Sequence, residues 1–329
     1  MMRSKSINYS YKYYKSMLMP TEQSAYQSIL DGVESFDSSI RVSYKVCDSM
    51  QKIVDYLRYD NPLLFHVNDF SYTATGNDVR IVPRYLMSRV DYEKMLGVIE
   101  TKIAGIAEII KSKYVSEQVA KLHEVVVRNI TYKDGPNSHN ILGPLNANAG
   151  VCDGISRFVK LICDHLKVEC VVLHGTAKAQ STNLSGSHSW NAIKLNGEWH
   201  LYDFTFDNTM NLANPCKEIV RFDYYALRKP EMERDHFGAD DSKINISSKK
   251  KDYFSSNGLV IKNRSELAAL IMRNKSGDIA FKLADSNEFT AFGKEIQNAI
   301  DTVNEQGKGV RRYEYAFNDI QRVCYLHLM

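Results

Sequence analysis

The chain has little proline and little glycine, with 7 and 17 of them among 329 residues. Both residues interrupt helices and strands, so their shortage excludes a collagen-like or low-complexity chain and favours regular secondary structure. Hydrophobic residues make up 44% of the sequence and charged residues 25%. This is the composition of a folded globular protein, and a chain this long can bury enough surface to fold without disulfides or metal.

Three further absences limit the partners and the location that we expect. The formal net charge is only +3, which gives no electrostatic reason to expect nucleic acid, and the one dense basic run, 249–251, is typical of a solvated linker. No stretch approaches the ~18 apolar residues of a membrane helix. Residues 1–9 lack the apolar core of a signal peptide. We therefore expect a cytoplasmic protein without a membrane partner, since secretion would require a leader that has been removed.

The six cysteines are scattered along the chain, which predicts reduced thiols rather than a disulfide framework. A possible zinc cluster is Cys163, His165, Cys170 and His174. Four residues along a strand span roughly 13 Å, so Cys170 and His174 cannot share one ion if both lie on a strand. We therefore expect no metal and no cofactor.

The apolar patterns divide the chain into four parts: an N-terminal, mostly helical extension (1–130), a catalytic core (131–237), a linker (238–256) and a small α/β domain (257–329). In the first part, helices are expected at 20–36, 92–111 and 115–130, and strands at 65–72 and 79–85. The last part predicts the order β-α-β-α-β-β, with strands at 259–262, 279–283, 313–317 and 322–328, one helix capped by Asn263 and another over 289–303.

Cys152 stands where a loop of small residues, 146–150, passes into an apolar pattern with helical spacing. Ile155, Phe158, Val159 and Ile162 follow on one face, so Cys152 is predicted in the first turn of an amphipathic helix, on its buried side. A helix N-terminus stabilises a thiolate by at most ~2 kcal/mol. A strongly ionised nucleophile therefore needs a cation nearby as well.

A predicted β-hairpin supplies that cation and an acid. Asn196-Gly197 between two strand-like runs is a strong signal for a two-residue turn, and this turn pairs position 195 with 198. The same register places Trp190 opposite Asp203. His188 and Asp203 then lie on one face as diagonal neighbours, roughly 7–8 Å apart at Cα.

These three residues predict a Cys-His-Asp triad. Cys152 would attack a carbonyl carbon, His188 would hold the thiolate and protonate the leaving amine, and Asp203 would orient the imidazole. The backbone N–H of Cys152 would bind the oxyanion, with Tyr132 or Asn140 as candidate second donors. His139 and His123 remain alternative bases, although His123 is expected to be exposed, and Asp207 is expected to be a turn residue.

The segments Gly150-Val151-Cys152-Asp153-Gly154, Ser187-His188-Ser189-Trp190-Asn191 and Tyr202-Asp203-Phe204-Thr205 resemble the transglutaminase-like superfamily of the papain-like cysteine peptidase fold. The resemblance covers about residues 138–236. It implies an α+β fold in which a helix carrying the cysteine packs on an antiparallel sheet carrying the histidine and the aspartate, and it implies the nucleophile, base and acid roles for Cys152, His188 and Asp203. Many members have an aromatic residue where this chain has Ile155 and proline where it has Phe204.

The resemblance does not select one reaction, because the family includes crosslinking enzymes, peptidases, amidases, deglycosylases and inactive binding forms. No EF-hand-like calcium loop and no paired C-x-x-C zinc module is present in the sequence. We expect a thiol-dependent acyl-transfer enzyme acting on amide or isopeptide bonds of peptides or proteins, with hydrolysis favoured over crosslinking because water is always available. The alternative is a catalytically silent module that binds peptides or proteins.

Overall fold

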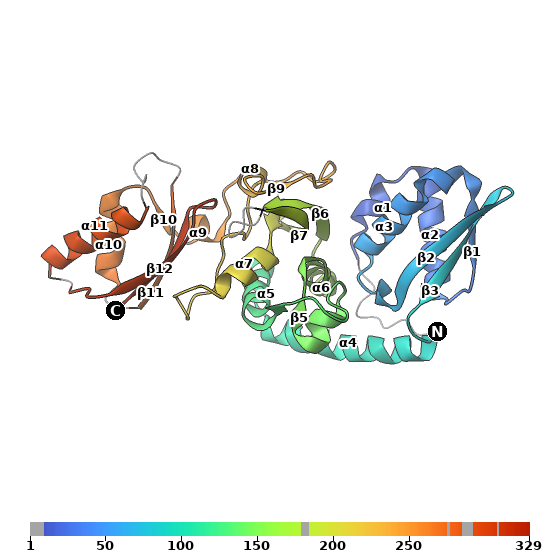
Figure 1. Cartoon of the computed structure of the whole chain (residues 1–329), viewed down its shortest axis with the longest axis horizontal. Coiled ribbons are helices and arrows are strands. Elements are labelled where there is room, and N and C mark those ends of the chain that lie inside the picture. Colours follow the sequence, from blue (N-terminus) through green and yellow to red (C-terminus); the bar gives the residue numbers. More distant parts are fainter. Residues whose placement is uncertain (1–9, 179–183, 275–276, 285–291, 308) are drawn as a thin grey trace.

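The computed structural model describes residues 10–178, 184–274, 277–284, 292–307 and 309–329. It has an α+β fold whose parts follow one another along the longest axis, with the N-terminal part at one end, the central part in the middle and the C-terminal part at the other end (Figure 1). Within the described residues, no helix is both long enough and apolar enough to cross a membrane.

The N-terminal part packs helices against a three-stranded antiparallel sheet of order β1-β3-β2. Its elements are α1 (Tyr13–Met17), α2 (Pro20–Glu34), β1 (Ile40–Ser43), η1 (Tyr44–Ser49), α3 (Met50–Asp60), η2 (Leu64–His66), β2 (Val67–Thr75) and β3 (Asp78–Tyr85). The helix at 20–36 and the two strands are confirmed. The sequence patterns missed α1, β1 and α3.

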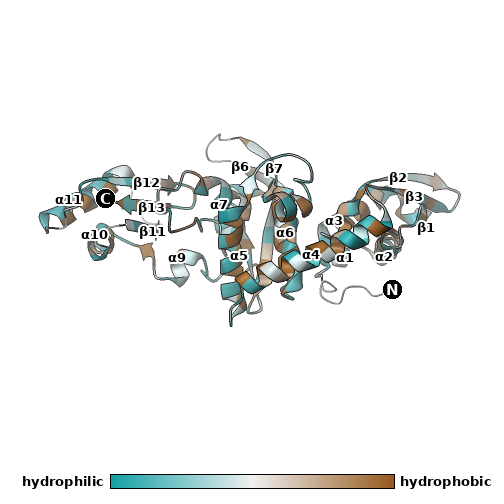
Figure 2. Ribbon diagram, turned by 90° about the horizontal axis from the view of Figure 1, so that it is seen from below, coloured by the Kyte–Doolittle hydropathy of each residue, from teal (hydrophilic) through white to brown (hydrophobic). Residues whose placement is uncertain are grey.

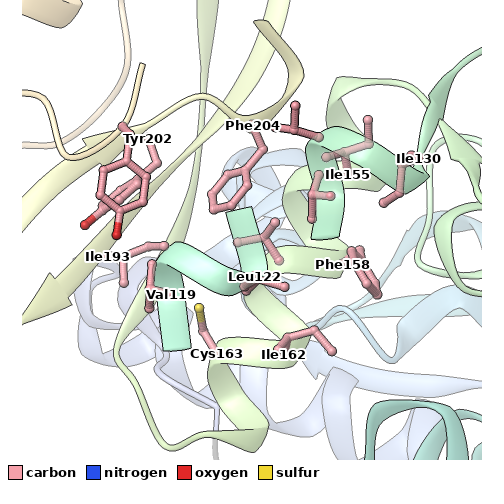
Figure 3. Packing of buried hydrophobic residues seen from close by; sticks show 14 of the residues in the cluster. Val119, Leu122, Ile130, Ile155, Phe158, Ile162, Cys163, Ile193, Tyr202 and Phe204 are labelled. Carbon is pink, nitrogen blue, oxygen red and sulfur yellow. The ribbon is translucent and has the colours of Figure 1, made fainter. Parts of the chain in front are cut away.

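Two long helices follow, α4 (Arg89–Ile109) and α5 (Val115–Asn129), as predicted. Only Ile99 and Ile103 of α4 are fully buried, and both join the apolar cluster of the central part. Hydrophilic and hydrophobic residues alternate along the rest of this helix (Figure 2). Val119 and Leu122 of α5 pack in the same cluster (Figure 3). Both helices thus belong to the packing around the central part, although they precede the division predicted at residue 130.

The central part is built on α6 (Cys152–His165) and a four-stranded antiparallel sheet of order β8-β7-β6-β9. The strands are β6 (Cys170–Lys178), β7 (Ser185–Leu195), β8 (Glu198–Tyr202) and β9 (His236–Phe237). Positive φ angles of 52° at Asn196 and 82° at Gly197 form the two-residue turn. Leu195 pairs with Glu198 and Asn191 with Tyr202, which confirms the predicted register. The pairing ends at Tyr202, because helix α7 (Phe204–Asn211) begins directly afterwards.

Short elements join these pieces: β4 (Thr131–Tyr132), η3 (Gly143–Ala147), β5 (Ala149–Gly150), α8 (Lys229–Met232) and α9 (Tyr253–Ser256). The segment predicted as a linker, 238–256, packs on the central part. Ile244 and Phe254 are buried in it, and Ile246 forms a β-bridge with Trp199.

The C-terminal part has the predicted order of strands and helices. Its elements are β10 (Val260–Ile261), α10 (Arg264–Arg273), β11 (Gly277–Leu283), α11 (Phe292–Glu305), β12 (Tyr313–Asn318) and β13 (Val323–Leu328). The Asn263 side chain accepts a hydrogen bond from the Glu266 backbone and so caps α10, as expected. Residues 289–291, where the second helix was predicted to begin, lie outside the described residues.

Candidate active site

Cys152 is the first residue of α6, as its sequence context predicts, and its side chain is half-buried. The loop before α6 approaches the helix closely. The Val151 N–H donates to the Ser138 carbonyl at 3.1 Å, and a Cβ at Gly154 would lie 2.1 Å from that same oxygen. Only glycine fits at position 154, so this part of the motif positions the loop against the first turn that carries the thiol.

The rest of α6 anchors the thiol to the core. Ile155, Phe158 and Ile162 are buried against α5 and against Ile193 of β7 (Figure 3). The first N–H groups of a helix have no partner within the helix and point out of its N-terminus. The Cys152 thiol and backbone N–H are therefore presented at this helix end on a rigid support.

His188 on β7 and Asp203 directly after β8 meet through their side chains. The distance from His188 Nε2 to Asp203 Oδ2 is 2.7 Å, and the two side chains are 8% and 0% exposed. Asp203 is also the N-cap of α7, because its Oδ1 accepts from the backbone N–H groups of Thr205 at 2.9 Å and Phe206 at 3.1 Å. The start of a helix therefore fixes the orientation of this carboxylate.

The electrostatics of His188 favour the imidazolium. Burial alone would lower its pKa, but the charge of Asp203, the hydrogen bond to Asp203 and the interaction with Cys152 outweigh burial and raise the pKa to about 10. Since Nε2 is bound to Asp203, Nδ1 is the ring nitrogen left for the interaction with Cys152. Phe206 lies 4.9 Å from the imidazole ring between centroids.

Asp203 stays ionised despite its burial. Burial raises the pKa of a carboxyl, yet the charge of His188 and hydrogen bonds from His188 and His236 hold the Asp203 pKa well below its ordinary value. His236 comes from β9, and its Nε2 lies 2.9 Å from the same Asp203 Oδ2. The sequence patterns placed no functional residue here, because His236 lies 33 positions from Asp203 and reaches it only through the pairing of β9 with β6.

His188, Asp203 and His236 form the single group of three potential ligands that the described ranges bring together for a metal ion. Their geometry is that of hydrogen bonds. His188 Nε2 and His236 Nε2 lie 2.7 and 2.9 Å from Asp203 Oδ2. Two ligand atoms that each lie ~2.0–2.2 Å from a shared zinc ion are farther apart than this. The arrangement therefore fits N–H donors on a carboxylate and does not fit a metal.

The two candidates for a second oxyanion donor differ in their surroundings. Tyr132 on β4 pairs with Gly150, and burial, followed by the charges of Cys152 and Asp203, raises the pKa of its hydroxyl. The Asn140 amide is engaged within its own loop, with Nδ2 donating to Asn137 and Oδ1 accepting from the Leu142 N–H. Tyr132 therefore remains the better candidate.

Two expectations about other residues are wrong. His123 is fully buried rather than exposed, with its Nε2 2.9 Å from the Arg221 carbonyl and 3.2 Å from Asp207 Oδ2. Asp207 is no turn residue, because it lies inside α7 and accepts from the backbone N–H groups of Asp223 and Tyr224. Both belong to a buried polar network that joins α5 to α7. His139 is exposed beside Asp134, at 3.6 Å.

The components considered for zinc are in different environments. Cys163 is buried on α6, while Cys170 and His174 lie four residues apart on one strand, β6, as expected. The His174 ring stacks on Tyr59 at 3.7 Å between centroids, and burial lowers its pKa to about 4.

The central part of the chain is similar to known proteins. Residues 104–204 match the family model described as "Transglutaminase-like superfamily". The chain is 31% identical over 94 residues to the mouse (Mus musculus) protein named kyphoscoliosis peptidase and 30% identical over 94 residues to the human (Homo sapiens) protein of that name. Each match covers 26% of this chain and 14% of the relative, so the chain spans only a small part of the length of these relatives.

A solved structure described as a TGase is 12% identical and gives a TM-score of 0.30, covering 42% of this chain and 44% of its own. The matched range of the family model contains Cys152, His188 and Asp203, together with the helix and the hairpin that carry them. Residues 104–204 of this chain are thus similar to the transglutaminase-like superfamily, within a longer α+β chain.

Proposed function

We propose that this protein is a thiol-dependent acyl-transfer enzyme that acts on amide or isopeptide bonds of peptides or proteins. The observation that carries the proposal is the 2.7 Å contact between His188 and Asp203 beside the thiol at the start of α6. A helix N-terminus and an imidazolium together favour the thiolate form of a cysteine. A protein that only binds peptides has no physical need for a polarised thiol.

The roles of the three residues follow from their positions. The sulfur of Cys152 attacks the carbonyl carbon of the amide, and the carbonyl oxygen becomes an oxyanion that accepts from the Cys152 backbone N–H and the Tyr132 hydroxyl. Nδ1 of His188 then gives its proton to the leaving amine, which departs and leaves a thioester on Cys152. Asp203 keeps Nε2 of His188 protonated and turned toward the carboxylate, so that Nδ1 faces the sulfur.

The acyl acceptor decides between hydrolysis and crosslinking. Water that attacks the thioester gives a free acid, while a lysine amine gives an isopeptide bond, and in both cases His188 takes the proton of the attacking group. We favour hydrolysis, because water needs no binding site and because the two curated relatives are named peptidases. We further propose a cytoplasmic location and peptide or protein substrates, without nucleic-acid or membrane partners.

Profiling on a peptide library tests this proposal. Wild type and Cys152→Ala are compared with and without an added primary amine, and the products are identified by mass spectrometry. We expect cleaved or deamidated peptides from the wild type alone. Amine-linked products in place of hydrolysis would change the acceptor, whereas identical results for both proteins would contradict an enzymatic role and favour a binding module.

Iodoacetamide gives a second test that needs no substrate. Near pH 6–7, we expect Cys152 to be alkylated stoichiometrically and much faster than the other five cysteines. Four of the other cysteines are buried: Cys163, Cys170, Cys216 and Cys324. Cys47 is half-buried like Cys152, so it is the matched comparison within the same molecule. Equal rates for Cys47 and Cys152 would count against an activated thiol.

A further inference from the structure

The carboxylate of Asp203 serves two histidines. His188 Nε2 and His236 Nε2 lie 2.7 and 2.9 Å from the same oxygen, Oδ2, while Oδ1 accepts from two backbone N–H groups. Asp203 therefore receives four hydrogen bonds and is 0% exposed. An orienting acid of a triad needs only the first of these histidines, so the second one requires its own explanation.

The ring of His236 lies between two carboxylates. Its Nδ1 is 2.6 Å from Asp235 Oδ1, and the other oxygen of Asp235 accepts from the Tyr224 hydroxyl. Since each ring nitrogen faces a carboxylate oxygen, the geometry favours a proton on both nitrogens, which makes His236 an imidazolium. Burial opposes this charge, but the hydrogen bonds to Asp203 and Asp235 raise the pKa of His236 above its ordinary value.

Three rings also lie close to the His236 ring. His188 is 5.5 Å away between ring centroids, and the aromatic rings of Trp190 and Phe206 are 5.0 and 4.9 Å away. The ionisable groups in contact with His236 are Asp203 at the start of α7, Asp235 beside β9, Tyr224 in the preceding loop and His188 on β7. Lys229, Glu233 and Asp241 line a small cavity together with His236. The cluster contains two buried carboxylates and two imidazoles.

We propose that His236 is a positioning residue that holds Asp203 in place and offsets part of its charge, so that His188 can release its proton to the leaving group. This proposal rests on the proposed function. A lone buried carboxylate at Nε2 would stabilise the imidazolium form of His188 so strongly that its Nδ1 would be a poor general acid. A second cation on the same oxygen weakens this stabilisation.

The separation of the two rings gives the size of the effect. At 5.5 Å between ring centroids, two unit charges at an effective dielectric constant of about 20 change each other's pKa by roughly two units. Without His236 as a cation, the titration of His188 is expected to move upward by about that amount. A histidine that only filled space in the sheet would leave this titration where it is.

Long-range ¹H–¹⁵N NMR of the full chain labelled with [¹⁵N]histidine measures the protonation state of His236 and the titration of His188. In the wild type at pH 7, His236 should give the nitrogen shifts of an imidazolium. In His236→Gln, which keeps an N–H donor but no charge, the titration of His188 should move up by roughly two pH units. His327→Gln is the matched control, because His327 binds Asp278 at 2.7 Å in the C-terminal sheet, away from Cys152.

A neutral His236 in the wild type overturns the proposal without any variant, which keeps it testable even if His236→Gln does not fold. A His188 titration in His236→Gln within about 0.3 pH units of the wild type also overturns it. These NMR measurements need no substrate. If the protein turned over no peptide of the library, that result would refute the proposed function but not the effect of His236 on the titration of His188.

Turnover rates distinguish an effect of the His236 charge on proton release from a purely structural role of His236. In His236→Gln, cleavage of an amide, whose leaving amine needs a proton, should slow by about tenfold or more. A p-nitrophenyl ester, whose leaving group needs none, should react within about threefold of the wild-type rate. Equal losses on both substrates would contradict a role in proton release.

Discussion

Asp203→Asn is the substitution that separates an activated cysteine from an ordinary one. Asparagine has nearly the same shape as aspartate and keeps an oxygen to cap α7, so the fold around the site is expected to survive. The charge that raises the pKa of His188 to about 10 is lost. Burial, which lowers that pKa, then dominates, and His188 becomes neutral in mildly acidic solution.

The expected loss can be worked out at pH 5.5. An ordinary thiol with a pKa of ~8.5 is three units below its midpoint there, so about one molecule in a thousand is a thiolate. The N-terminus of α6 can stabilise the thiolate by at most ~2 kcal/mol, which raises the thiolate fraction by about thirtyfold. If the wild type holds an ion pair between Cys152 and His188, alkylation in Asp203→Asn should be slower by at least about thirtyfold.

The assay is the rate of iodoacetamide alkylation of Cys152, followed by peptide mass spectrometry between pH 5 and pH 8. Asp278→Asn is the control, because it removes the acid from the His327 pair in the C-terminal sheet. We expect this control to react as the wild type does. A rate for Asp203→Asn within threefold of the wild type at pH 5.5, in a protein that still melts cooperatively, would refute the ion pair.

Two further predictions concern stability. Gly154→Ala places a Cβ 2.1 Å from the Ser138 carbonyl and should lower the free energy of unfolding by roughly 1–3 kcal/mol, while Gly186→Ala, which meets nothing within 4 Å, should not; equal urea midpoints would contradict the close packing. The pKa of His188 is raised to about 10 in the folded state, so its stabilisation is fully present below pH ~6.5 and is lost as the pH rises through about 10. Urea unfolding at pH 6 and pH 10 should show a pH-dependent loss in the wild type that His188→Gln reduces, and equal losses in both proteins would refute the assignment.

The elements that carry the site could be predicted from local patterns. The Asn196-Gly197 turn determines its own register, because a two-residue loop allows only one pairing of the flanking strands. The apolar face that follows Cys152 has helical spacing, so the position of the thiol in the first turn of α6 also followed from the sequence. The C-terminal strands and helices were predicted for the same reason, since each is bounded by turn or capping residues.

The polar network behind the site could not be predicted in this way. His123, Asp207 and His236 are fully buried, although their residue types are usually exposed. Each is stabilised by a partner brought to it by tertiary packing, at sequence separations that no local pattern records. A buried charge is stable only when a partner lies close to it, and a single sequence does not show which distant residue is that partner.

Asp203 has a consequence for how this centre can change over evolutionary time. One oxygen of this side chain caps α7 and the other accepts from both imidazoles, so a single short carboxylate satisfies a helix end and two histidines together. Glutamate carries the same charge but is one methylene longer, and its carboxylate would leave either the helix end or the rings unsatisfied. Drift at this position is thereby restricted by backbone geometry as well as by chemistry, and a homologue that replaced Asp203 with a residue other than asparagine would need a new cap for α7.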